Sequence, residues 1–188
     1  MGRRYAIFIV AVFLNACSIV PEKPVEEFRL ADMQYLQQQK NWSFEGRLVL
    51  IDEKDSVSVS ILWRHAENLD DIELFGPLGQ GRLKISVEGD RIVVDDGEAR
   101  NVYYGQPNEV LAEQLRVNMP VDALRFWVLG VNDPEQDFVV QPGGFFQGGW
   151  LVRYREMQQV KDYLLPKKIT VQKDKTRIKL IVDQWDLS

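Results

Sequence analysis

The spacing of apolar residues changes several times along this chain and predicts one sheet interrupted by helices. From residue 42 onward, apolar and polar residues alternate with period two, as in strands that bury one face. The alternation is clearest in residues 57–63 and 82–87. Their apolar faces are Val57, Val59, Ile61 and Trp63, and Leu83, Ile85 and Val87. Shorter runs predict strands at 42–51, 71–75, 91–95, 99–103, 138–141, 149–155, 167–172 and 176–185, joined as an antiparallel meander.

Helical spacing occurs in residues 25–40 and again in residues 106–130. Pro107 and Pro120 suit the first turns of two helices, and Gly130 suits the position just beyond the second. We expect the glycine-rich residues 142–150 to be a hairpin connection. The predicted strands are too many for three helices to cover one face of a flat sheet. The predicted fold is therefore mainly β: a curved antiparallel sheet forming an unclosed (half) β-barrel, with about three helices capping or filling an apolar cavity.

The N-terminus has the layout of an export signal. Arg3 and Arg4 precede a ten-residue apolar run, which is too short for a lasting membrane span. The sequence "LNAC", residues 14–17, resembles the lipobox of bacterial lipoproteins, which implies cleavage before Cys17 and acylation of it; a plain signal peptide is the alternative. In lipoproteins of enteric bacteria, an Asp directly after the acylated Cys tends to retain the protein in the inner membrane. The residue at that position here is Ser18, which by this resemblance implies sorting to the outer membrane. The expected organisation is a signal peptide at 1–16, a lipidated tether at 17–24, and one domain at 25–188.

Composition and charge limit the classes of molecule that this protein is expected to bind. With 45% hydrophobic and 27% charged residues, the 188-residue chain is globular in composition. Removal of residues 1–16 leaves 21 basic against 28 acidic residues, a net charge of −7. This acidity argues against nucleic acid or anionic lipid as the main partner and suits a basic protein partner.

Catalytic and metal-binding patterns are weak. The single histidine, His65, is expected to be an exposed turn residue, and the pairs Asp70–Asp71 and Asp95–Asp96 to be turn formers on the solvated surface. The only cysteine is the one expected to be acylated, so no thiol nucleophile or Cys/His metal cluster can be assembled. The glycines of residues 76–81 lack the lysine and following helix of a phosphate loop. We therefore expect no enzyme, no metal and no cofactor.

What remains is apolar surface. Bulky apolar residues on the concave side of a curved sheet can enclose a ligand cavity or simply fill a core, and the sequence leaves both open. The candidate cavity residues are Val59, Ile61, Trp63, Leu74, Leu83, Ile85, Ile178 and Leu180.

Several segments together resemble one family. They are the lipobox with Ser18, Trp42 and Gly46, Trp63, "GPLG" at 76–79, "MPVDALRFWVLG" at 119–130, "GGWLVRY" at 148–154 and "RIKLIVDQW" at 177–185. In this order and over the whole chain they are similar to LolB, the family of outer-membrane lipoprotein receptors. The resemblance implies an unclosed, apolar-lined barrel that accepts acylated lipoproteins from the LolA-type periplasmic carrier. It also implies that the protein inserts these lipoproteins into outer-membrane phospholipid. The protein itself is then expected to be a monomer, anchored in the outer membrane and facing the periplasm.

Two other functions fit the same pattern: a membrane-tethered module for free lipid or another apolar ligand, and a structural envelope lipoprotein with a packed core. The turn at Pro77, Leu78 and Gly79 bears on this choice, because an apolar residue at a turn tip is unusual. Together with the resemblance, it makes Leu78 a candidate for dipping into the bilayer. The alternative is that Leu78 folds back onto the body as a plug.

Overall fold

The computed structural model describes residues 28–53, 55–76, 81–115 and 119–187. The predicted lipidation and sorting residues, Cys17 and Ser18, lie outside the described residues, as does the turn of Pro77, Leu78 and Gly79.

The described residues form one antiparallel sheet of eleven strands, in the order β6-β5-β4-β3-β2-β1-β11-β10-β9-β8-β7. Its first half contains β1 (Asn41–Ile51), β2 (Ser56–Ala66), β3 (Leu69–Phe75), β4 (Arg82–Glu88), β5 (Arg91–Asp95) and β6 (Arg100–Tyr104). Its second half contains β7 (Phe138–Gln141), β8 (Gly144–Gln147), β9 (Trp150–Val160), β10 (Tyr163–Lys173) and β11 (Thr176–Leu187). The pairing of β1 with β11 joins the two halves.

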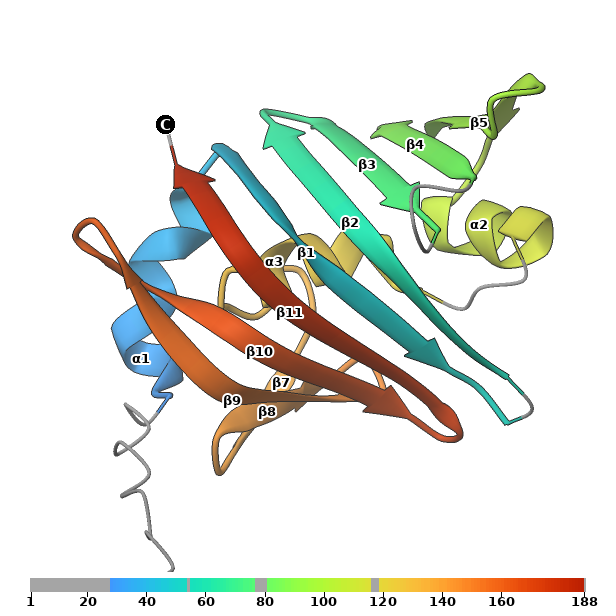
Figure 1. Cartoon of the computed structure of the whole chain (residues 1–188). Helices are drawn as coiled ribbons and strands as arrows, with labels where there is room; N and C mark the ends of the chain where they lie inside the picture. The colour runs from blue at the N-terminus through green and yellow to red at the C-terminus, as the bar shows by residue number, and fades with distance from the viewer. Residues whose placement is uncertain (1–27, 54, 77–80, 116–118, 188) are drawn as a thin grey trace, which may run out of the picture.

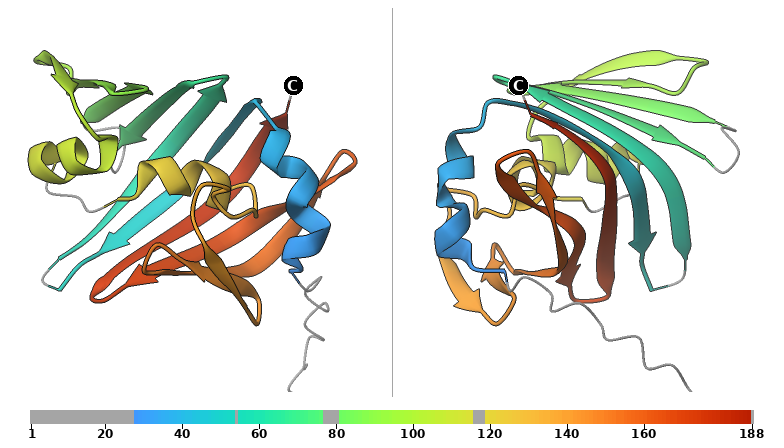
Figure 2. Two further views of the ribbon diagram at one scale, coloured as in Figure 1. Left: turned by 180° about the vertical axis from the view of Figure 1, so that it is seen from behind. Right: turned by 60° about the vertical axis from the view of Figure 1, so that its left-hand side comes forward.

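The sheet curves strongly but does not close, because β6 and β7 end the strand order without pairing to each other. Figure 2 shows the long strands bending around the helices. The prediction of an unclosed, mainly β fold is confirmed.

The helices lie on the concave side of the sheet (Figures 1 and 2). They are α1 (Leu30–Met33) continued by the 3₁₀-helix η1 (Gln34–Gln38), α2 (Pro107–Leu115) and α3 (Val121–Trp127). The first of these differs from the single helix predicted over residues 25–40. Its described part is one α-helical turn that tightens into 3₁₀ geometry and ends at Gln38.

The packed core is centred on aromatic side chains of the middle strands. Trp42 and Phe44 of β1 alternate inward and meet Trp63 of β2 and Trp185 of β11. The ring centroids of Trp42 and Trp63 are 5.6 Å apart, and those of Phe44 and Trp185 are 5.1 Å apart. Such offset and tilted contacts stabilise the core beyond area burial alone.

Helix α3 is fastened to the second half of the sheet through the buried Trp127. The indole Nε1 donates to Oε1 of Gln147 in β8 at 2.8 Å, and the hydroxyl of Tyr154 in β9 donates to the carbonyl of Trp127 at 2.8 Å. Full burial raises the pKa of Tyr154 well above its ordinary value, so the hydroxyl stays a donor.

The prediction that residues 142–150 are a hairpin connection is wrong, because they contain strand β8. Two tight turns flank it, with positive φ at Gly143, Gly148 and Gly149. Within the strand, Phe145 is buried and its neighbour Phe146 is exposed, as the strand period requires. The glycines that suggested a loop are the turns on either side of a four-residue strand.

Candidate functional site

An apolar hollow of about 460 Å³ opens on the concave face of the first half of the sheet. Its volume lies in the range of about 300–1,000 Å³ that is usual for small-ligand pockets. The lining consists of Leu48 and Leu50 of β1, Val57 and Val59 of β2, Leu74 of β3, Leu83 and Ile85 of β4, and Gly76, Gly81, Arg82, Asp96 and Met119. The walls are therefore apolar, and the two charged residues in the lining are Arg82 and Asp96.

The strand period explains why these side chains converge. Antiparallel register sets Leu48 opposite Val59, and Leu74 opposite Leu83. Residues two apart on each strand face the same side, so apolar rows from four adjacent strands meet on one surface. Leu50, Val59, Leu74 and Leu83 are only partly buried. The hollow thus exposes apolar surface that a folded chain would ordinarily cover.

The predicted cavity residues divide into two sets. Val59, Leu74, Leu83 and Ile85 line the hollow. Ile61, Trp63, Ile178 and Leu180 belong to the packed core, with exposed fractions of 1–4%. The two sets share the concave face, and the second set lies where other side chains already fill the space.

Sequence reasoning missed four apolar residues of the lining: Leu48, Leu50, Val57 and Met119. Val57 was placed on the apolar face of its strand but not among the cavity candidates. Leu48 and Leu50 carried a usable signal, because they alternate within a segment predicted to be a strand. Met119 carried none, because it reaches the hollow from the segment before α3 and not from a strand.

The predictions for His65 and for the pair Asp70–Asp71 as turn residues are wrong, because His65 lies in strand β2 and both aspartates lie in strand β3. Strand β3 begins at Leu69, so Asp70 points into the protein and is 2% exposed. Its Oδ1 accepts a hydrogen bond from Trp63 Nε1 at 2.8 Å and lies 2.8 Å from His65 Nδ1. Arg125 of α3 lies 3.9 Å from Oδ2. This cluster ties α3 to the first half of the sheet, and His65 is an interior strand residue stacked on Trp42.

The prediction for Asp95 and Asp96 is confirmed. Asp95 accepts a hydrogen bond from the Gly97 N–H, and Asp96 accepts from the N–H groups of Glu98 and Ala99. These bonds lower the pKa of Asp96, led by the one from Ala99. Both carboxylates therefore shape the turn between β5 and β6.

In the described ranges, no three His, Cys, Asp or Glu side chains are placed to hold a metal ion. No helix in those ranges has the length and apolar composition that a membrane span requires.

Residues 40–185 match the family model described as "Outer membrane lipoprotein LolB". The chain belongs to the LolB family. It is 29% identical to the outer-membrane lipoprotein LolB of Halorhodospira halophila over 99% of this chain and 96% of that protein. It is 28% identical to the LolB of Alkalilimnicola ehrlichii over 100% of this chain and 98% of that protein. The names of these relatives support an outer-membrane lipoprotein.

Solved structures support the fold of this LolB-family chain. A LolA superfamily protein from Nitrosomonas europaea superposes with a TM-score of 0.50 at 11% identity, over 80% of this chain and 87% of that one. A DUF1329 family protein from Desulfovibrio piger gives a TM-score of 0.55 at 7% identity, over 85% of this chain and 90% of that one. The LolB family match supports a function in lipoprotein localisation.

Proposed function

We propose that this protein accepts lipoproteins from a LolA-type periplasmic carrier and inserts them into the inner leaflet of the outer membrane. The observation that carries the proposal is the apolar hollow of about 460 Å³, open on the concave face of a LolB-family fold. In this proposal the acyl chain of the cargo occupies the hollow, against the row formed by Val59, Leu74, Leu83 and Ile85. The protein acts as a monomer.

The energetics of lipid transfer explain why such a hollow is needed. Each buried methylene contributes about 0.8 kcal/mol, so exposing a chain of about fifteen methylenes to water costs on the order of 12 kcal/mol. The cargo must pass directly from one apolar site to the next. A receptor that binds acyl chains more favourably than the carrier, and less favourably than the bilayer, drives transfer without a nucleotide.

The N-terminus supplies the location in this proposal. Acylation at Cys17 anchors the protein, Ser18 directs it to the outer membrane, and the domain faces the periplasm. The net charge of −7 after cleavage favours a transient encounter with a basic rim on the carrier. Transfer rates should therefore fall as ionic strength rises.

The loop between β3 and β4 is the proposed membrane-contacting element. Its flanking residues, Gly76 and Gly81, line the apolar hollow, and the Gly76 N–H donates to the Gly81 carbonyl at 3.2 Å. The loop therefore starts and ends at the mouth of the proposed acyl site. We assign Leu78, held between Pro77 and Gly79, the role of entering the bilayer during delivery.

The decisive experiment mixes a soluble form that begins after Cys17 with carrier loaded with lipoprotein, and follows the cargo by co-purification. Movement of cargo to this protein is the expected result. If no cargo moves while the protein binds an apolar fluorescent probe, a binding module for free lipid replaces the proposal. If neither cargo nor probe binds, a structural lipoprotein replaces it.

A further inference from the structure

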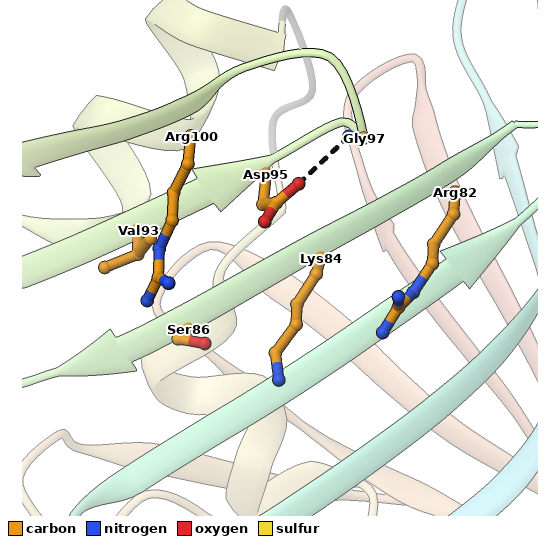
Figure 3. A pocket seen from close by; sticks show the side chains of 7 residues that line it. All are labelled: Arg82, Lys84, Ser86, Val93, Asp95, Gly97 and Arg100. Carbon is orange, nitrogen blue, oxygen red and sulfur yellow. Dashed lines mark hydrogen bonds between the residues drawn. The ribbon is translucent and has the colours of Figure 1, made fainter.

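A second hollow lies on the opposite, convex face of the sheet, over strands β4–β6, and it is cationic. It has a volume of about 240 Å³ and is lined by Arg82, Lys84, Ser86, Val93, Asp95, Gly97 and Arg100. Figure 3 shows the side chains of Arg82, Lys84 and Arg100 extending to the same side of the strands. The lining itself carries three cations and one carboxylate. Two further carboxylates, those of Asp71 and Glu73, lie beside Lys84 and Arg82.

Two of the three cations are held in place by neighbouring carboxylates. Arg82 donates to Oε2 of Glu73 through Nε at 3.1 Å and Nη2 at 2.8 Å. Lys84 Nζ lies 3.8 Å from a carboxylate oxygen of Asp71 and 4.0 Å from one of Glu73. Glu73 also lies 3.8 Å from Arg64. These contacts position Arg82 and Lys84 and offset part of their charge.

Arg100 is different. Within the described residues its guanidinium has no carboxylate partner within 4 Å. The carboxylate of Asp95, which is opposite Arg100 in the β5–β6 register, accepts the Gly97 N–H at 2.9 Å. The hollow therefore keeps an unpaired, planar cation with several N–H donors beside two prepositioned ones. This arrangement suits the oxygens of a phosphate ester.

The cationic and apolar hollows meet at one rim of the sheet. Arg82 lines both. In the turn between β5 and β6, Asp96 lines the apolar hollow, and its neighbours Asp95 and Gly97 line the cationic one. Apolar and cationic surfaces on either side of one rim match an amphiphile that has acyl chains and an anionic headgroup.

We propose that the cationic hollow binds the phosphate of a phospholipid headgroup and so orients the rim of the apolar hollow against the bilayer. This inference rests on the proposed delivery of cargo to a membrane. The hollow would bind the oxygens of a phosphate ester. Inorganic phosphate presents the same oxygens without the glycerol, so the experiment must distinguish the two ligands.

The first test titrates the full chain in nonionic detergent separately with glycerophosphoglycerol, a headgroup without acyl chains, and with inorganic phosphate. The NMR signals of arginine Nε–H groups report binding. Saturable shifts of the Arg82 and Arg100 signals by the ester are expected, with about threefold weaker affinity in Arg100→Gln. Arg153→Gln, which removes an exposed cation from β9, is the matched control and should bind like the unmodified protein.

Three results would overturn the inference: no saturable shift, an equal loss of affinity in both variants, or inorganic phosphate binding at least as tightly as the ester. A second measurement separates this inference from the proposed function. Arg100→Gln should accept cargo from the loaded carrier at the normal rate and deliver it more slowly to phospholipid vesicles. Normal delivery by Arg100→Gln contradicts the headgroup site alone, whereas failure of the unmodified protein to accept cargo contradicts the proposed function.

Discussion

At the scale of single residues, the buried carboxylate of Asp70 links three elements. It accepts the indole N–H of Trp63 in β2, contacts His65 and faces Arg125 of α3. A buried acceptor is costly to remove because its donors are then left without a partner. Asp70 therefore supports the packed half of the concave face, against which α3 lies.

Replacement of Asp70 by Asn should lower the free energy of unfolding by about 1–3 kcal/mol, because it removes a buried charge that holds several donors. Asp183→Asn is the matched control. Asp183 lies 3.6 Å from Arg47, and both side chains are more than half exposed, so its loss should cost less than about 1 kcal/mol. Urea unfolding followed by tryptophan fluorescence measures both, and equal losses would contradict the role given to Asp70.

Leu78 provides the second prediction at this scale. Leu78→Glu should leave cargo uptake from the carrier intact and impair insertion into vesicles, because a carboxylate opposes entry into the acyl region of a bilayer. Cargo acceptance and vesicle insertion are measured separately on the same variant. A fall in thermal stability with normal insertion would instead support the plug that the sequence leaves open.

At the scale of elements, β8 shows how a strand can depend on a glycine. A Cβ at Gly144 would overlap the carbonyl oxygen of Val152 in β9, so only glycine permits this close pairing. The same strand carries Gln147, which binds Trp127 of α3. The short strand that the glycine-rich sequence concealed therefore helps to hold a helix on the concave face.

Gly144→Ala should destabilise the protein by at least about 2 kcal/mol, because the pairing of β8 with β9 must separate to admit the methyl group. Gln141→Ala, an exposed substitution on the neighbouring strand β7, should change stability little. Thermal unfolding of the two variants makes the comparison. A stable Gly144→Ala variant would show that the pairing tolerates a side chain.

Strands β9 and β10 are joined by a charge contact that gives a pH dependence. Hydrogen bonds from Lys167 and Lys168 hold the pKa of Glu156 below its ordinary value of 4.5. A lowered folded-state pKa contributes stability above pH 4.5 that is lost as the pH falls through the folded value. Urea midpoints should therefore be higher for the unmodified protein than for Glu156→Gln at pH 7, and the difference should shrink below pH 4.5. A pH-independent difference would contradict this.

At the scale of the whole molecule, the concave face is divided between a packed part and an open part. Aromatic side chains, with α3 fastened above them, fill the region around Trp63 and Trp185. Beyond this region, the apolar rows of the sheet continue to Val59 and Leu83, where the hollow takes the place of packed aromatic side chains. The hollow is thus the uncovered continuation of the core.

Filling the hollow should block an acyl ligand. Val59→Trp should weaken binding of an apolar fluorescent probe by about tenfold or more, because the indole occupies the space the ligand needs. Val139→Trp makes the same substitution at a 59% exposed position on β7 and should leave probe affinity unchanged. Fluorescence titration compares them, and normal affinity in Val59→Trp would place the ligand elsewhere.

Alternation and turn chemistry are local properties of the chain, so the sequence was enough to predict every strand except β8, the helices after residue 106 and the unclosed architecture. It also grouped Val59 with Trp63 and Leu83 with Ile85 on one face. The local pattern could not show which of these residues line a hollow, which belong to the core, or that Asp70 is buried. Those outcomes depend on where α3 and the aromatic side chains pack against the sheet, and packing between segments distant in the chain has no local signature.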